Sequence, residues 1–438
     1  MGWNILILVY AVLSVYFSYY YFKERPTFSI VTVLLFLYSV FSMIGYINYP
    51  KKLNVVSGGQ YYGEKVFLYY YLYLLVFVIF VFIFYRFFNG IRRKYSANVI
   101  TINVVGGKAV LYVFLISFCV FLFYEMIKNI SISSYSNQLV LKSNKVWFFL
   151  YEFSGVIILM LSNILYKNRV ELKKNNGLFI VLTVAFAIVF IATSLLFGQR
   201  KEIFMLIVGM ITMLINYLKV SNQHKRISMK KVILLTVPLL IVAVFLFQLI
   251  RNSRGLGISE YQLNAGELLL TTFKSMFDME FLVFQDWLSP SLSLITCIYY
   301  HNIDPLIILK ADFLNLFSFL THYSVDPTTP IRDLFNLHST TGYGYYFPTE
   351  GYELIGPFGC VLSAFLINLY YRVYDSIFDV KDVYLRSYLS GIVGFYIISI
   401  VRGYSLFFIK GIIFYIIPGI VLYNLATKCG FKIIKVKD

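Results

Sequence analysis

Val232–Ile250 has the sequence VILLTVPLLIVAVFLFQLI and carries no charged side chain. A helix that crosses the hydrocarbon core of a bilayer needs about 20 mostly apolar residues. Ala109–Tyr124, with the sequence AVLYVFLISFCVFLFY, shows the same pattern much earlier in the chain. Because such stretches recur along the whole chain, the sequence predicts an all-α polytopic membrane protein.

The composition agrees with a membrane protein and excludes an ordinary soluble domain. Of 438 residues, 59% are apolar and 13% are charged, whereas a soluble domain carries about 25% charged residues. The formal net charge of +17 does not indicate nucleic acid, because the basic residues lie at the ends of apolar stretches, where the positive-inside rule explains them. We therefore expect membrane lipids as partners, and no nucleic acid.

Hydropathy predicts about 11 transmembrane helices. They lie near residues 3–22, 27–48, 66–85, 109–127, 146–166, 178–197, 203–218, 232–250, 356–371, 387–401 and 405–424. Along its length the chain divides into an eight-helix region at 1–250, a long loop at 251–355, and a three-helix region with a tail at 356–438, all within one membrane domain. Lys and Arg are more abundant after the odd-numbered helices, so we expect the amino terminus outside and the carboxyl terminus in the cytoplasm.

The loop at 251–355 is too apolar for a soluble domain. Phe273–Leu288 and Leu306–Tyr323 are apolar and aromatic, but acidic residues and Pro290 interrupt them. Such segments are typical of helices that lie at the membrane interface, and we expect interfacial helices here. A true transmembrane helix in one or both segments is the alternative.

The cysteines and histidines do not indicate a metal site. Cys119, Cys297, Cys360 and Cys429 are far apart in the sequence, and the chain has 4 His. This pattern supports neither a disulfide framework nor a set of metal ligands. We expect no metal and no other cofactor.

Basic residues on the predicted outer side form a candidate anion site. Gly198-Gln199-Arg200-Lys201 lies at the start of a predicted helix, where exposed N–H groups and the helix dipole favour negative charge. A guanidinium group binds two phosphate oxygens at once and stays protonated. The candidate pyrophosphate-binding residues are Arg200, Lys201, Arg251, Arg254, Arg332, Arg402 and Lys410. For any one of them, contact with lipid headgroup phosphates is the alternative.

Some charged residues lie well inside predicted helices. Lys410 is in the last helix and Glu152 is in the fifth. Ionisable groups within a membrane are costly and are usually functional. Lys410 is a candidate on that ground, although its long side chain can also reach the headgroup region. Glu152 is a weaker candidate for a residue that faces a functional cavity.

The segment His338–Tyr352 alternates small residues with tyrosines. His338 or Glu350 is the candidate general base toward a sugar hydroxyl. The candidate glycan-binding residues, whose rings can stack on sugars, are Tyr343, Tyr345 and Tyr352. The alternative is an interfacial aromatic belt in which Glu350 caps a helix.

In this order of features the chain resembles the bacterial O-antigen polymerases, the oligosaccharide repeat-unit polymerases called Wzy. The resemblance covers most of the chain and includes a long outer loop before the last three helices. The motifs that carry it are Gly198-Gln199-Arg200, His338-Ser339, Glu350-Gly351-Tyr352, Gly356-Pro357-Phe358-Gly359, Val401-Arg402-Gly403 and Lys410. They resemble the family's Gly-x-Arg loop, its acidic and small-residue run, its late outer arginine and a basic residue in the next helix.

The resemblance implies a fold of the class-C glycosyltransferase type in the bacterial inner membrane, acting without metal. It implies that two undecaprenyl-pyrophosphate-linked oligosaccharides are joined at the periplasmic face, with release of undecaprenyl pyrophosphate. It also implies a chain-length regulator of the Wzz type as a partner.

Two alternatives to a polymerase stay open. An O-antigen ligase shares much of the same plan. A non-enzymatic flippase or polysaccharide transporter would bind the same lipid-linked glycan, but transporters more often show two similar halves. The predicted helix lengths do not pair in that way.

Overall fold

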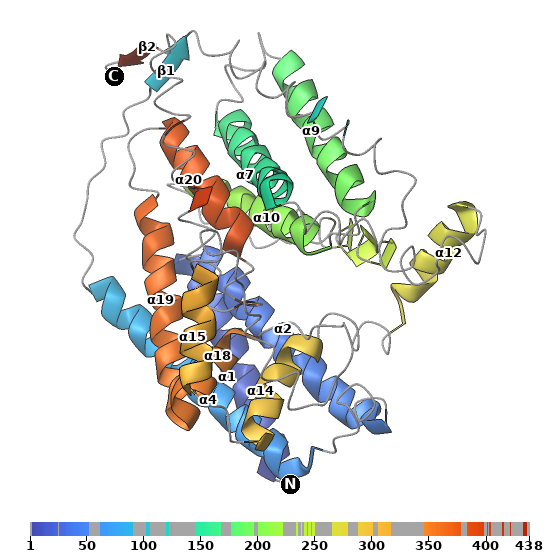
Figure 1. Ribbon diagram of the computed structural model, residues 1–438. Coiled ribbons are helices and arrows are strands. Elements are labelled where there is room, and N and C mark those ends of the chain that lie inside the picture. The colour runs from blue at the N-terminus through green and yellow to red at the C-terminus, as the bar shows by residue number, and fades with distance from the viewer. Residues whose placement is uncertain are drawn as a thin grey trace. The chain divides into compact units, whose positions relative to one another are not determined.

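The computed structural model is almost entirely helical over the residues that it describes (Figure 1). These are residues 2–24, 26–51, 62–90, 102–105, 120–121, 124, 145–167, 177–196, 200–221, 234, 238, 241–242, 244–246, 248–249, 265–278, 288–300, 305–316, 346–377, 383–397, 401, 403, 414–415, 421 and 432–435. One small antiparallel sheet joins β1 (Ile102–Val105) to β2 (Lys432–Lys435). Apart from this sheet, the prediction of a helical protein is confirmed.

Three segments of the described chain are long and apolar enough to cross a membrane. They are Phe28–Asn48 in α2 (Pro26–Asn48), Glu64–Phe88 in α4 (Glu64–Gly90), and Phe347–Arg372. The last comprises α18 (Phe347–Ile355), the short 3-10 helix η2 (Gly356–Phe358) and most of α19 (Gly359–Ile377). The chain is therefore a membrane protein by the length and composition of its helices, and the count of about 11 spans stays a prediction.

Several other helices coincide with predicted spans. These are α1 (Gly2–Glu24), α7 (Lys145–Lys167), α9 (Gly177–Leu196), α10 (Arg200–Ser221) and α20 (Val383–Tyr396). They overlap the predicted ranges 3–22, 146–166, 178–197, 203–218 and 387–401. Most residues of the predicted spans 109–127, 232–250 and 405–424 lie outside the described part of the chain.

The chain folds into two compact units, each built from segments that are distant in sequence. Unit 1 comprises Met1–Lys94, Asp278–Asp375 and Ile397–Gly411, and unit 2 comprises Tyr95–Phe277, Ser376–Tyr396 and Ile412–Asp438. The predicted regions were divisions along the chain, whereas the units group segments by contact in space.

The core of unit 1 includes a helix that the sequence did not predict. In this unit α1 packs against α2 and α4, and α14 (Leu288–Tyr300) packs against α2, α4 and α18 (Figure 1). Residues 290–298 of α14 are all buried. Pro290 was expected to interrupt helical structure, but it lies in the first turn of α14. A proline fits there because its missing N–H would have no partner within the helix.

The structure describes parts of the two segments that were expected to form interfacial helices. In the first segment, α12 (Ala265–Ser275) ends before Asp278, which has non-helical backbone, and residues 279–287 lie outside the described part of the chain. The second segment contains α15 (Pro305–Leu316), which exposes Leu306 and Phe313. The position of these helices relative to a membrane interface stays a prediction.

Glycines bring three helices of unit 2 into close contact. An added Cβ at Gly391 on α20 would lie 2.9 Å from the Val156 carbonyl oxygen of α7, and one at Gly209 on α10 would lie 3.0 Å from the Gly394 carbonyl oxygen of α20. Gly155 of α7 lies directly against the ring of Phe395. Small residues are common at contacts between membrane helices because they let the backbones approach.

Replacing Gly391 by Leu is expected to lower the stability of unit 2. The new side chain would meet backbone atoms of α7, which cannot rotate away, and overpacking of this kind costs about 1–3 kcal/mol. Thermal unfolding of the detergent-purified protein measures the effect. The matched control is Gly266→Leu, in the exposed helix α12, where an added Cβ meets nothing within 4 Å. Equal melting temperatures for the two variants would contradict the packing.

Candidate functional site

The helix α18 carries Glu350, and the sequence around it explains where it begins and ends. Tyr346 precedes it in an extended conformation, with φ −98° and ψ 124°, and Pro348 lies in its first turn. Proline favours a helix start because its φ is already helical. Gly356 ends the helix with φ 63°, a conformation that glycine adopts without a steric penalty.

Gly351 of α18 lies directly against the backbone of Gly359, the first residue of α19. In one continuous helix these residues would be separated by about 12 Å along the axis. Their contact shows that the chain turns back through η2, so the segment Phe347–Arg372 is not a straight helix. A side chain at either glycine would meet backbone atoms of the other.

Two hydrogen bonds fix the residue that precedes α18. The Tyr346 backbone N–H donates to Ser293 Oγ of α14 at 3.2 Å, and the Tyr346 hydroxyl donates to the Leu35 carbonyl of α2 at 3.0 Å. Two more hold the first turn. Tyr73 of α4 donates to the Pro348 carbonyl at 2.9 Å, and Ser293 and Thr349 share a bond between hydroxyls at 2.8 Å. The start of α18 is therefore tied to three other helices of unit 1.

A further hydrogen bond joins the start of α18 to the turn near residue 402. The Phe347 N–H donates to the Val401 carbonyl at 3.2 Å. Val401 and Gly403 are both buried, and Arg402 lies between them in the sequence. Two motifs that are about fifty residues apart in the chain are therefore adjacent at this point of the fold.

Two buried carboxylates lie on α18. Glu350 is 4% exposed and Glu353 is 3% exposed, and residues three apart on a helix share a face. Glu350 is in the first turn, where the helix dipole stabilises a negative charge. The buried Cys297 thiol of α14 lies 3.6 Å from Glu353 Oε1 and is a weak donor to it. This helix therefore offers two buried acidic groups, and a carboxylate can act as a general acid or base.

Sequence reasoning found Glu350 but missed Glu353 and Cys297. The signal for Glu353 was available, since its three-residue spacing from Glu350 predicts one shared face if the segment is helical. The sequence assigned this segment to the long loop at 251–355, and not to a helix. Nothing in the sequence predicted contact with Cys297, which depends on α14.

Tyr352, a predicted glycan-binding residue, is half-buried on α18. Its ring lies 5.4 Å from that of Tyr73, in an edge-to-face arrangement with an angle of 73° between planes. This aromatic pair holds Tyr352 in unit 1. Whether it binds a sugar stays a prediction.

The predicted pyrophosphate-binding residues are only partly covered by the structure. The backbone of Arg200 and Lys201 forms the start of α10 in unit 2, as the sequence predicted. Glu202 follows in the same first turn and is buried. This carboxylate was not among the predicted site residues, and it competes with a bound anion for the positive end of the helix. The remaining predicted site residues lie outside the described residues: Arg251, Arg254, Arg332, His338, Tyr343, Tyr345, Arg402 and Lys410.

The buried carboxylate of Glu152 on α7 accepts hydrogen bonds from two tyrosines. Its Oε2 accepts hydrogen bonds from the Tyr396 hydroxyl at 2.7 Å and the Tyr415 hydroxyl at 2.9 Å. Its side chain is 7% exposed. A buried carboxylate with two phenol donors links α7 to α20 in unit 2, so its contacts support a structural role.

Among the described residues, no three His, Cys, Asp or Glu side chains gather in a way that would hold a metal ion. The chain matches no protein-family model, no curated protein and no solved structure. A function is therefore inferred from the residues, their contacts and the order of features along the chain.

Proposed function

We propose that this protein is a metal-independent glycosyltransferase that polymerises surface polysaccharide, in the manner of an O-antigen polymerase. It would join undecaprenyl-pyrophosphate-linked oligosaccharide repeat units at the periplasmic face of the bacterial inner membrane. A partner of the chain-length-regulator kind would set the length of the product. The class-C glycosyltransferase-like arrangement of about 11 spans is part of the same proposal.

The observation that carries the proposal is the hydrogen bond between Phe347 and Val401. This bond joins α18, which carries the buried acids Glu350 and Glu353, to Val401, which directly precedes Arg402 in the sequence. Glycosyl transfer from a pyrophosphate needs a base for the attacking hydroxyl and a cation for the leaving group. These are the two residue types that the adjacent motifs supply.

In the proposed reaction a hydroxyl of the incoming repeat unit attacks the anomeric carbon of the growing chain. A new C–O bond forms, the C–O bond to pyrophosphate breaks, and the hydroxyl proton passes to the carboxylate of Glu350. Undecaprenyl pyrophosphate leaves with the bonding electron pair, and Arg402 stabilises the charge that develops on it. His338 is the second candidate base. Because pyrophosphate leaves readily, orientation of the two substrates contributes much of the rate.

Deletion of the gene, followed by electrophoresis of the surface polysaccharide, tests the proposed function. The proposal predicts that single repeat units remain and the ladder of longer chains disappears. Loss of all repeat units from the acceptor core would indicate a ligase instead. Accumulation of repeat units on the cytoplasmic side would indicate a flippase.

Replacing Arg402 by Ala is expected to slow polymerisation about ten- to a hundredfold. Charge-assisted hydrogen bonds contribute roughly 1.5–3 kcal/mol, which corresponds to that range. Arg402→Lys should restore only part of the rate, since a point charge cannot bind two oxygens at once. The measurement is the chain length of the polysaccharide that each variant makes at matched membrane expression. Arg200→Ala is measured in the same way. The controls are Ala variants of three arginines on the predicted cytoplasmic side: Arg92, Arg93 and Arg226. Normal chain lengths in both Arg402→Ala and Arg200→Ala would indicate that Arg402 and Arg200 contact lipid headgroups instead of the substrate.

The proposed orientation can be tested with alkaline phosphatase fusions. Charge asymmetry predicts that Ser221, at the end of α10, faces the cytoplasm and that Ser275, at the end of α12, faces the periplasm. Alkaline phosphatase is active only after export, so the fusion at Ser221 should be inactive and the fusion at Ser275 active. The reverse pattern would refute the orientation.

A further inference from the structure

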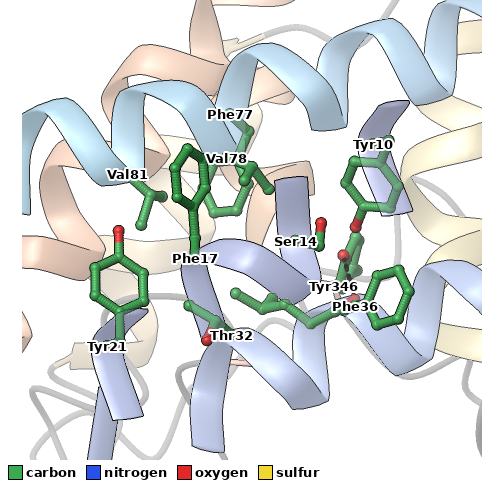
Figure 2. A pocket seen from close by; sticks show the side chains of 11 residues that line it. Tyr10, Ser14, Phe17, Tyr21, Thr32, Phe36, Phe77, Val78, Val81 and Tyr346 are labelled. Carbon is green, nitrogen blue, oxygen red and sulfur yellow. Dashed lines mark hydrogen bonds between the residues drawn. The ribbon is translucent and has the colours of Figure 1, made fainter. Parts of the chain in front are cut away.

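A small cavity lies within unit 1, between α1, α2 and α4 (Figure 2). Its volume of about 20 Å³ is enough for one water molecule. Aromatic and aliphatic side chains form most of its wall. The residues of the wall that carry a hydroxyl are Tyr10, Ser14 and Tyr21 of α1, Thr32 of α2, and Tyr346, the residue before α18.

Ser14 is a buried residue of the wall whose bonding is incomplete. Its side chain is 5% exposed, and its Oγ makes no hydrogen bond within the described part of the chain. It lies close to the Tyr10 hydroxyl without reaching the geometry of a hydrogen bond. A buried hydroxyl that makes no hydrogen bond is costly, so a polar partner within the cavity would stabilise the fold.

The neighbouring hydroxyls keep capacity for one more bond. The Tyr10 hydroxyl is paired with Ser39 Oγ at 2.8 Å, and the Tyr346 hydroxyl donates to the Leu35 carbonyl at 3.0 Å. Each phenol oxygen can still accept a hydrogen bond. In Figure 2 the side chains of Ser14, Tyr10 and Tyr346 lie near one another in the view.

We propose that one ordered water molecule binds in this cavity. It accepts a hydrogen bond from Ser14 Oγ and donates to the hydroxyl oxygens of Tyr10 and Tyr346. Three bonds are the usual number for a buried water. The water thereby connects α1 to Tyr346, the residue before α18, and the proposal does not depend on the protein's enzymatic function.

X-ray radiolysis in H₂¹⁸O tests the proposal, because hydroxyl radicals formed from a bound water oxidise the side chains beside it. The detergent-purified full chain is irradiated, and ¹⁸O incorporation is measured by mass spectrometry. Tyr10 is expected to be labelled several-fold faster than Tyr396, which is equally buried but does not line the cavity. Equal labelling of the two tyrosines would overturn the proposal.

Variants of α1 and α2 identify the residue that holds the water. Ser14→Ala should reduce labelling of Tyr10 to the level of Tyr396, whereas Ser14→Thr, which keeps the hydroxyl, should retain it. The matched control is Ser29→Ala, because Ser29 bonds the Ser18 carbonyl at 2.7 Å in the same α1–α2 contact but does not line the cavity. Undiminished labelling in a folded Ser14→Ala variant would contradict binding at Ser14. If that variant does not fold, the comparison of Tyr10 with Tyr396 in the native protein still shows whether a water molecule binds in the cavity.

Discussion

Replacing Glu350 by Gln is expected to slow polysaccharide polymerisation about a hundredfold or more, since a positioned general base contributes about 10²- to 10⁴-fold. The amide keeps the size of the side chain and its place in the first turn of α18, but it cannot accept the hydroxyl proton. The variant should therefore bind lipid-linked substrate almost normally and lose turnover. Chain length at matched expression, with an initial-rate assay on membranes, measures both effects.

Two further variants make the Glu350 prediction specific. Glu267→Gln is the matched control, because Glu267 also lies in the first turn of a helix but is exposed on α12. Glu353→Gln tests the second acid of α18. If Glu350→Gln is fully active and Glu353→Gln is inactive, the base is Glu353. If both are active, neither acid of α18 is the base and His338 becomes the remaining candidate.

Replacing Gly359 by Leu is expected to abolish polymerisation and to lower the melting temperature more than Gly391→Leu does. Gly359 lies against the Gly351 backbone, so a side chain there would force α18 away from α19. Overpacking costs typically 1–3 kcal/mol and occasionally more, and here backbone atoms on both sides would have to move. The displaced helix is the one that carries Glu350 and Glu353, so activity and stability should fall together.

The Gly359 prediction can be separated from a general loss of folding. Gly359→Ala, with a single methyl group, should give an intermediate effect in both thermal unfolding and polymerisation. Gly266→Ala, at an exposed position with open space, should behave as the native protein does. A Gly359→Leu variant that melts and polymerises normally would show that α18 and α19 do not turn back on each other.

Hydropathy predicted the long helices well because their burial does not depend on a particular partner. The segments that became α2 and α4 are apolar along their whole length, so length and composition are enough. The helix α14 was missed because it contains serines, Thr296 and Pro290. Its Ser291 hydroxyl donates to the Tyr38 carbonyl at 2.8 Å, and Thr296 pairs with Tyr62 at 3.0 Å. These hydroxyls are buried because distant segments satisfy them, and a local pattern does not contain that information.

Residues of the candidate site could be predicted only where a single residue was chemically distinctive in the sequence. Glu350 was found because a carboxylate beside tyrosines and glycines is chemically distinctive. The adjacency of Phe347 and Val401 depends on how unit 1 is assembled, and hydropathy does not determine tertiary contacts. Glu152 was a candidate functional residue because an ionisable group within a membrane is energetically costly. Its two tyrosine partners come from α20 and the segment beyond it, and only the fold shows that they satisfy it.

The most direct test of the proposed function is polymerisation by the purified protein in liposomes that contain undecaprenyl-pyrophosphate-linked repeat units. Mass spectrometry of the glycans and assay of released undecaprenyl pyrophosphate follow the two products together. We expect oligomers of the repeat unit, with one undecaprenyl pyrophosphate released for each new linkage. The reaction should proceed in the presence of EDTA, and at a much lower rate with Glu350→Gln. Folded protein that forms no linkage above the rate of protein-free liposomes, or that only moves the lipid-linked unit across the bilayer, would contradict it.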